Sequence, residues 1–200
     1  MFKIAVLVSG GGSNLQAILD SENHKKLYEV VCVVADRECY GIERAKERGI
    51  ETKIFDRKIF KKTISHEIHE FLGDRVELVV LAGFLSILEG QFIDERKEKI
   101  INIHPSLLPK FGGPGMFGMR IHRAVIEGKE KKSGCTVHYV DGGVDTGKII
   151  EQVEVEVGGE DTPETLQKKV LVEEHKLLPR AIKKIIAFAP LSPNGTSPIT

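Results

Sequence analysis

The stretch FKIAVLVSGGGSNLQAIL at residues 2–19 decides the fold class of this 200-residue chain. Residues 2–8 are a nearly continuous apolar run, which is typical of a strand covered on both faces. Glycines at 10–12 break the run, and apolar residues then follow at helical spacing. Ser13 and Asn14 stand where a side chain can cap the start of a helix. The stretch therefore predicts a strand, a glycine turn and a helix in direct succession.

The same alternation continues to about residue 104. Apolar, β-branched runs predict further strands at residues 30–35, 51–55, 76–82 and 99–104. Helical patterns at residues 40–48 and 60–72 lie between them. This order predicts a Rossmann-like α/β fold, which is an open, mostly parallel sheet with helices on both faces.

The character of the chain changes after residue 104. Residues 105–118 contain three prolines and four glycines, and long irregular loops of this kind are usually functional. A helix at 119–127 precedes two strands, at 134–140 and 148–157, which predict an antiparallel or mixed addition to the sheet. A final helix over about 161–187 is expected to kink at Pro179. We expect one domain over residues 1–188 and a flexible tail over residues 189–200.

Composition excludes several classes of protein. The 29 Lys and Arg residues balance the 29 Asp and Glu residues, so the basic excess of a nucleic-acid-binding protein is missing. No apolar stretch approaches the ~18 residues of a membrane span. The three cysteines form no C-x-x-C pair, which argues against a disulfide framework or a structural zinc site. These features favour a protein of the cytoplasm without a membrane or nucleic-acid partner.

Two candidate ligand sites follow predicted parallel strands, where open α/β sheets bind ligands. The first is SGGGSN at residues 9–14, where glycines and a helix N-terminus can hold a phosphate. The loop matches neither the dinucleotide pattern G-x-G-x-x-G nor the P-loop pattern. A glycine turn followed by an ordinary helix cap is an equally good interpretation of these residues alone.

The second candidate site is NIHP at residues 102–105. Asn102 and His104 are two residues apart on a strand, so their side chains share one face. An amide beside an imidazole can stabilise an oxyanion and handle protons, although a simple hydrogen-bonded histidine at a strand end is the alternative. Asp145 lies in DGGVDTG, which could be only a hairpin turn. If this loop reaches His104, the carboxylate would favour the charged imidazole.

In combination, four segments resemble the folate-dependent formyltransferase family. They are SGGGSNLQAI near the N-terminus, LAGFLSIL at residues 81–88, INIHPSLLPKF at residues 101–111 and GGVDTGKII at residues 142–150. The resemblance extends over residues 2–185. The HPSLLP motif is shared by the wider family. The SGGGSN loop is similar to the phosphate loop of the branch that formylates glycinamide ribonucleotide.

The resemblance implies transfer of a formyl group from 10-formyltetrahydrofolate to the amine of N1-(5-phosphoribosyl)glycinamide, a step of de novo purine biosynthesis. It implies no metal. The matching catalytic residues are Asn102, His104 and Asp145. The residues that match binding positions for the ribonucleotide are Gly12, Ser13, Asn14 and Glu174. The residues that match the folate pocket are Leu85, Ser86, Ile87, Leu88 and Asn102.

The sequence departs from this family pattern in two segments, residues 85–86 and the loop at residues 111–118, which is longer than in the shortest members. Many members have Met-Arg where this chain has Leu85 and Ser86, so a guanidinium contact to the folate is lost there. The basic residue that the family places near its third helix could be any of Arg57, Lys58, Lys61 and Lys62. The conformation of residues 110–118 and the oligomeric state stay open at this stage.

Three other functions share some of these motifs. A formyltetrahydrofolate hydrolase uses water as acceptor and carries an additional N-terminal domain, for which we expect no room before the first strand. Methionyl-tRNA formyltransferase carries an additional C-terminal tRNA-binding domain. A non-catalytic module that binds a nucleotide or folate needs the glycine loop but not His104 and Asp145 together. We therefore expect the transferase.

Overall fold

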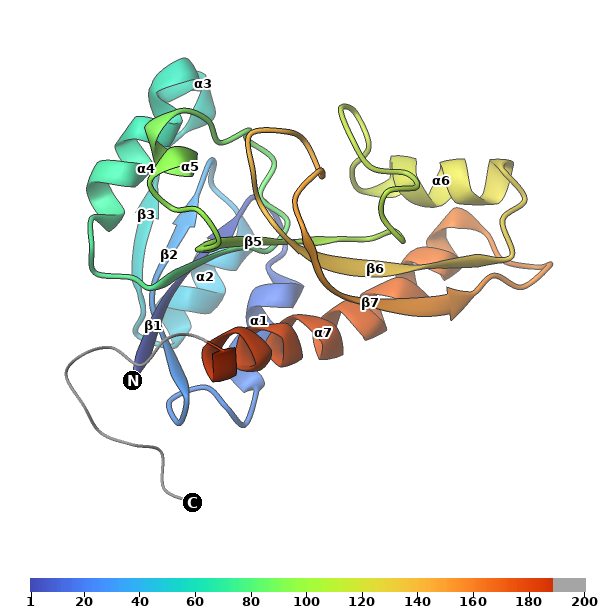
Figure 1. Cartoon of the computed structure of the whole chain (residues 1–200), viewed down its shortest axis with the longest axis horizontal. Coiled ribbons are helices and arrows are strands. Elements are labelled where there is room, and N and C mark those ends of the chain that lie inside the picture. The colour runs from blue at the N-terminus through green and yellow to red at the C-terminus, as the bar shows by residue number, and fades with distance from the viewer. Residues whose placement is uncertain (189–200) are drawn as a thin grey trace.

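A seven-stranded sheet forms the centre of the computed structural model, which describes residues 1–188 (Figure 1). The strand order is β3-β2-β1-β4-β5-β6-β7. Strands β1 to β5 pair in parallel, whereas β6 and β7 are antiparallel. The bounds are β1 Phe2–Val8, β2 Tyr28–Ala35, β3 Glu51–Ile54, β4 Leu78–Leu81, β5 Ile100–His104, β6 Lys132–Tyr139 and β7 Ile149–Glu156. The predicted parallel sheet and its antiparallel addition are both confirmed.

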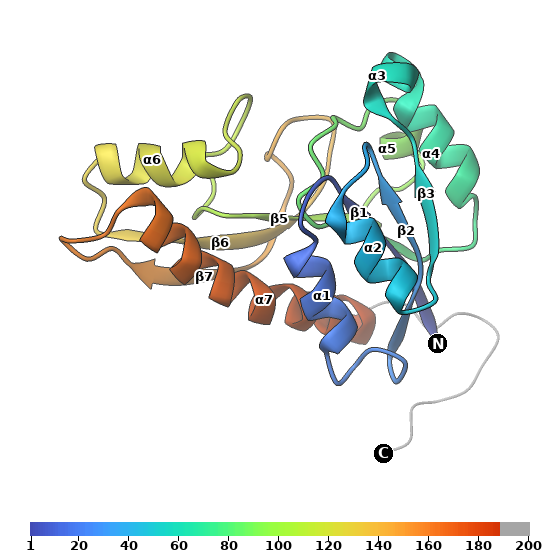
Figure 2. The same ribbon diagram turned by 180° about the vertical axis from the view of Figure 1, so that it is seen from behind.

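Helices cover both faces of the sheet, as the alternation predicts. The bounds are α1 Ser13–Asp20, α2 Tyr40–Glu47, α3 Arg57–Phe60, the 3-10 helix η1 Lys61–Thr63, α4 Ile64–Leu72, α5 Gln91–Asp94, α6 Met119–Glu127 and α7 Pro163–Phe188. Figure 2 shows α1, α2 and α7 against one face, where one core cluster forms. Helices α4 and α5 bury their apolar residues in a second cluster on the other face. Within residues 1–188 no helix is both long and apolar enough to cross a membrane.

The predicted helix over residues 60–72 is wrong in its bounds. The Asp56 side chain accepts a hydrogen bond from the Lys58 backbone N–H at 2.8 Å, so a short helix already begins at Arg57. At Lys61 the backbone takes a φ of 41°, which an α-helix does not tolerate. The segment therefore divides into α3, η1 and α4. The four-residue helix α5 was not predicted from the sequence.

Helix α7 extends through Pro179 without interruption. Proline removes one backbone hydrogen bond from a helix interior. Here Pro179 is buried with its neighbours Leu177, Leu178, Ala181 and Ile182. These side chains pack into the core cluster that α1 shares, so packing holds the two halves of the helix together. The expected flexible tail over residues 189–200 lies outside the described residues.

Candidate active site

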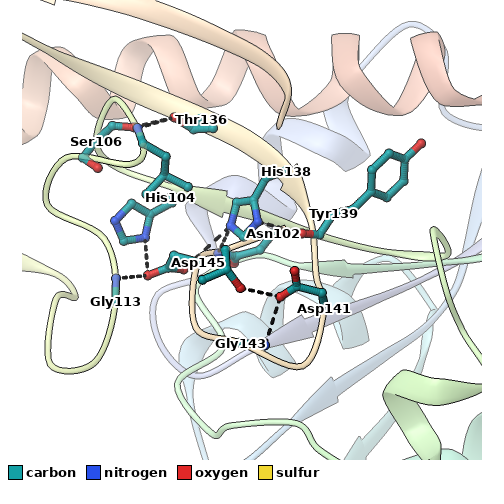
Figure 3. A network of polar contacts seen from close by, with 12 residues as sticks. Asn102, His104, Ser106, Gly113, Thr136, His138, Tyr139, Asp141, Gly143 and Asp145 are labelled. Atoms are coloured by element: carbon teal, nitrogen blue, oxygen red, sulfur yellow. Dashed lines mark hydrogen bonds and ion pairs between the residues drawn. The ribbon is translucent and has the colours of Figure 1, made fainter. Parts of the chain in front are cut away.

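Two of the three predicted catalytic side chains are in contact (Figure 3). His104, the last residue of β5, is buried, and its Nδ1 lies 3.5 Å from Oδ2 of Asp145. Asn102 lies two residues earlier on the same strand and therefore projects to the same side. The loop between β6 and β7 thus does reach the imidazole. The hairpin-turn interpretation of DGGVDTG does not account for this contact.

The orientation of the His104 ring is fixed by the loop that follows β5. Its Nε2 lies 2.9 Å from the carbonyl oxygen of Phe111, which can only accept, so Nε2 carries a proton. Phe111 has a φ of 56°, a left-handed conformation that is unfavourable for a bulky residue. The neighbouring Gly113 N–H donates to Oδ2 of Asp145 at 3.0 Å. The nitrogen left to meet a substrate is therefore Nδ1, on the side of Asp145.

His138 is a further member of the site that the sequence analysis missed. It is buried on β6, directly opposite Asn102 in the antiparallel pairing. Its Nδ1 lies 2.8 Å from the Tyr139 carbonyl oxygen, and its Nε2 lies 3.1 Å from Nδ2 of Asn102. Burial lowers the pKa of His138, which agrees with a neutral ring whose Nε2 accepts from the amide. His138 therefore sets which way the Asn102 amide points.

Asp141 shapes the loop that carries Asp145. Its Oδ1 accepts hydrogen bonds from the Gly143 N–H at 3.0 Å and from the Thr146 hydroxyl at 2.6 Å. The hydrogen bonds from the Thr146 hydroxyl and the Gly143 N–H lower the pKa of Asp141, so its carboxylate stays charged. Asp145 itself has a φ of 58°, a conformation that Asp adopts more readily than most residues. This loop geometry aims the Asp145 carboxylate at His104.

The glycine turn after β1 has the features of an anion site. Gly12 has a φ of 69°, and a Cβ there would lie 2.6 Å from the Gly41 Cα, so only glycine fits. Helix α1 begins directly at Ser13, and among the described residues no side chain caps it. Its first N–H groups are therefore available to a ligand. The expectation that Ser13 or Asn14 caps the helix is wrong, because Gly12 occupies the cap position.

Glu174 of α7 meets Asn14 of α1 beside this turn. The Asn14 amide Nδ2 donates to the Glu174 carboxylate at 2.6 Å, and both side chains are buried. Burial raises the pKa of Glu174 to about 7. The Asn14 Oδ1 has no hydrogen-bond partner among residues 1–188. The residues expected to bind the ribonucleotide therefore lie together, and the Asn14 Oδ1 can still accept a hydrogen bond from a ligand.

The segment expected to line a folate pocket connects β4 to α5. Leu85 and Ile87 are 45% and 69% exposed, whereas Leu88 is buried and Ser86 is partly buried. Apolar side chains held in solvent in this way suit an aromatic ligand. The four basic candidates on α3 and η1 are all exposed, and no contact distinguishes one of them. They are Arg57, Lys58, Lys61 and Lys62.

Metal ligands were not expected from the sequence. Within residues 1–188 no group of three or more His, Cys, Asp and Glu side chains could hold a metal ion. The three cysteines are unpaired, and two of them, Cys32 and Cys135, are buried.

Comparison with known proteins shows the family of this chain. The family model described as formyl transferase matches residues 2–182. The chain belongs to the formyl transferase family. Solved structures similar to this chain include glycinamide ribonucleotide transformylase 1 from Symbiobacterium toebii, at 38% identity and a TM-score of 0.86, covering 94% of this chain and 88% of that one. Phosphoribosylglycinamide formyltransferase from Brucella melitensis has 37% identity and a TM-score of 0.84, covering 96% and 98%.

Curated relatives of this chain are longer. The chloroplastic phosphoribosylglycinamide formyltransferase of Arabidopsis thaliana is 40% identical over 181 residues, which are 88% of this chain and 62% of the relative. The trifunctional purine biosynthetic protein adenosine-3 of Drosophila pseudoobscura pseudoobscura is 41% identical over 194 residues. That match covers 94% of this chain but only 14% of the relative, so the chain corresponds to one part of the longer protein.

Proposed function

We propose that this formyltransferase transfers the formyl group of 10-formyltetrahydrofolate to the amine of N1-(5-phosphoribosyl)glycinamide, in purine biosynthesis. The observation that carries the proposal is the contact between His104 Nδ1 and the Asp145 carboxylate, with Asn102 on the same face of β5. The names of the relatives support the choice of substrates. We also propose a cytoplasmic location, from the cysteine usage.

Formyl transfer needs one group that stabilises the negative charge of the oxyanion and another that accepts a proton. The neutral amine attacks the formyl carbon, so a C–N bond forms and the carbonyl electron pair moves onto oxygen. The Asn102 amide and protonated Nδ1 of His104 donate to this oxyanion. Phe111 holds the opposite nitrogen and so prevents the ring from turning away.

The tetrahedral intermediate then releases tetrahydrofolate. The amine of the intermediate carries an extra proton, which the Asp145 carboxylate accepts, directly or through a water molecule. The oxyanion reforms the carbonyl, the bond from carbon to N10 of the folate breaks, and the proton that Asp145 accepted passes to N10, which leaves Asp145 as a carboxylate again. Asp145 lies 3.5 Å from His104 Nδ1, and its negative charge attracts the imidazolium.

The ribonucleotide binds across the α1 N-terminus. Its phosphate accepts hydrogen bonds from the uncapped N–H groups of Ser13 and Asn14 after the Gly12 turn. Its ribose hydroxyls donate to the Glu174 carboxylate, and the unpartnered Oδ1 of Asn14 accepts one further hydrogen bond. The folate packs against the exposed side chains of Leu85 and Ile87.

Hydrolysis, with water as the acceptor of the formyl group, is the alternative reaction, because Asn102, His104 and Asp145 can also activate a water molecule. Purified protein is incubated with 10-formyltetrahydrofolate, with and without the ribonucleotide, and loss of the formyl donor is followed by absorbance. We expect turnover only with the ribonucleotide, together with a formylated product in the mass spectrum. Equal turnover in both tubes would establish the hydrolase instead. No turnover in either tube would contradict both reactions.

A further inference from the structure

A buried carboxylate that has no role in the reaction described above contacts the segment expected to bind folate. Asp36 follows the last residue of β2, and its side chain is fully buried. Arg37 holds it with two hydrogen bonds, from Nε at 2.8 Å and from a terminal nitrogen at 3.0 Å. The Ser86 hydroxyl donates to the same carboxylate at 2.7 Å. Asp36 thus connects the end of β2 to the segment expected to bind folate.

A second anchor holds the same segment from β1. The Ser9 N–H donates to the carbonyl oxygen of Gly83 at 3.1 Å, and the Leu85 N–H donates to the Ser9 hydroxyl at 2.8 Å. Burial raises the pKa of Asp36, but hydrogen bonds from Arg37, Ser86 and Ser9 outweigh burial and lower it. Asp36 is therefore a charged acceptor toward which several donors converge.

The far end of the segment is held as well, by Ser65 of α4, whose hydroxyl accepts from the Glu89 N–H at 3.0 Å. Between these anchors, Phe84 and Leu88 are buried, and Leu85 and Ile87 are exposed. The exposed pair gains its orientation from the fixed backbone, because solvent-exposed side chains have little packing of their own. Loss of the central anchor would free the backbone between Leu85, which Ser9 still holds, and Glu89, which Ser65 still holds.

We propose that Asp36 is a positioning residue for the formyl-folate half of the site, acting through Ser86 on the segment that presents Leu85 and Ile87. The proposal rests on the proposed function, since it assigns folate to this segment. Asp36 itself does not touch the substrate. Arg37 balances the buried charge and keeps the carboxylate in place.

The test compares four variants, Asp36→Ala, Asp36→Asn, Ser86→Ala and the double variant Asp36→Ala/Ser86→Ala. The hydrogen bond from Ser86 to the charged Asp36 is a strong one, and its loss loosens the segment that binds folate. Asp36→Ala should therefore raise the KM for formyl folate about 10-fold or more. We expect kcat and the KM for the ribonucleotide to change less than about 2-fold. Asparagine keeps an oxygen that accepts from Ser86, so Asp36→Asn should restore most of the affinity.

Asp161→Ala is the matched control. The Asp161 side chain is also mostly buried and accepts from the Gly158 N–H, the Thr165 hydroxyl and Lys169, but at the start of α7. Its loss should lower thermal stability without changing either KM. If Asp36→Ala and Asp161→Ala lower activity in the same way, with no selective effect on folate, the role is only structural and the proposal is wrong.

Direct binding separates this inference from the proposed function. Binding of formyl folate to the wild-type protein and to Ser86→Ala is measured by calorimetry without the ribonucleotide. Weaker binding to Ser86→Ala, and a double variant no weaker than Asp36→Ala alone, support the proposal. Equal binding to the wild type and to Ser86→Ala overturns it and leaves the function intact. Absence of binding to the wild type overturns the proposed function itself, and the positioning role with it.

Discussion

Replacement of Glu174 by Gln should stabilise the free protein in a pH-dependent manner. Burial raises the pKa of Glu174 from 4.5 to about 7, so its ionisation costs the folded state free energy. Below pH 4.5 the folded and unfolded states are both protonated and no cost arises. The cost grows as the pH rises from 4.5 to about 7 and is then complete, at about 3 kcal/mol.

Glutamine has nearly the same shape but carries no charge. Its oxygen can still accept from Asn14 Nδ2, and its amide can donate to Asn14 Oδ1, which has no other partner among residues 1–188. The free energy of unfolding should therefore be higher in Glu174→Gln by about 3 kcal/mol at pH 8.5, and by less than about 1 kcal/mol at pH 5. Urea unfolding at the two pH values measures this difference.

Glu173→Gln serves as the control, because Glu173 neighbours Glu174 but lies at the surface, paired with Lys176. It should change stability little at either pH. The same stability difference for Glu174→Gln at pH 5 and pH 8.5 would refute the assignment of the raised pKa to this carboxyl. We also expect the KM for the ribonucleotide to rise about 10-fold in Glu174→Gln, since ribose hydroxyls donate more strongly to a carboxylate.

The remaining predictions concern the glycine turn and the catalytic centre. Gly12→Ala should raise the KM for the ribonucleotide at least about 10-fold, because the new Cβ meets Gly41 and moves the turn; an unchanged KM would contradict the phosphate site. Asp145→Asn keeps the backbone conformation but removes the charge, and kcat should fall about 100-fold with both KM values nearly constant. A smaller effect than about 3-fold would exclude Asp145 as the proton acceptor. His138→Ala should lower kcat about 10-fold by freeing the Asn102 amide; steady-state kinetics with unchanged kcat would show that His138 has no orienting role.

The strands that bear the site could be predicted from sequence because their signal is local. The run at residues 2–8 and the pattern at residues 99–104 specify buried strands, and the two-residue spacing places Asn102 and His104 on one face. The parallel order follows from the alternation with helices. The contact with Asp145 depended on a loop conformation that no local pattern specifies. The sequence leaves this contact conditional, and the structure shows that the two side chains do meet.

Features that depend on strand register or on helix-cap geometry could not be predicted from the sequence. His138 contacts Asn102 because β6 pairs with β5 in one particular antiparallel register, and a shift by one residue would turn it away. Ser13 is a good capping residue, yet the left-handed Gly12 takes the cap position and leaves Ser13 inside the helix. Asp36 gave no signal in the sequence, because its partner Ser86 is 50 residues away and follows β4, which is separated from β2 by β1 in the sheet.

In the proposed reaction His104 stabilises the oxyanion, so the turnover of His104→Ala tests whether formyl transfer takes place at this site. Donor absorbance is followed with saturating 10-formyltetrahydrofolate and ribonucleotide, and folate binding is measured separately by calorimetry. We expect a kcat at least about 100-fold below that of the wild type, with nearly unchanged folate affinity. A kcat within about 3-fold of the wild type would contradict this role of His104.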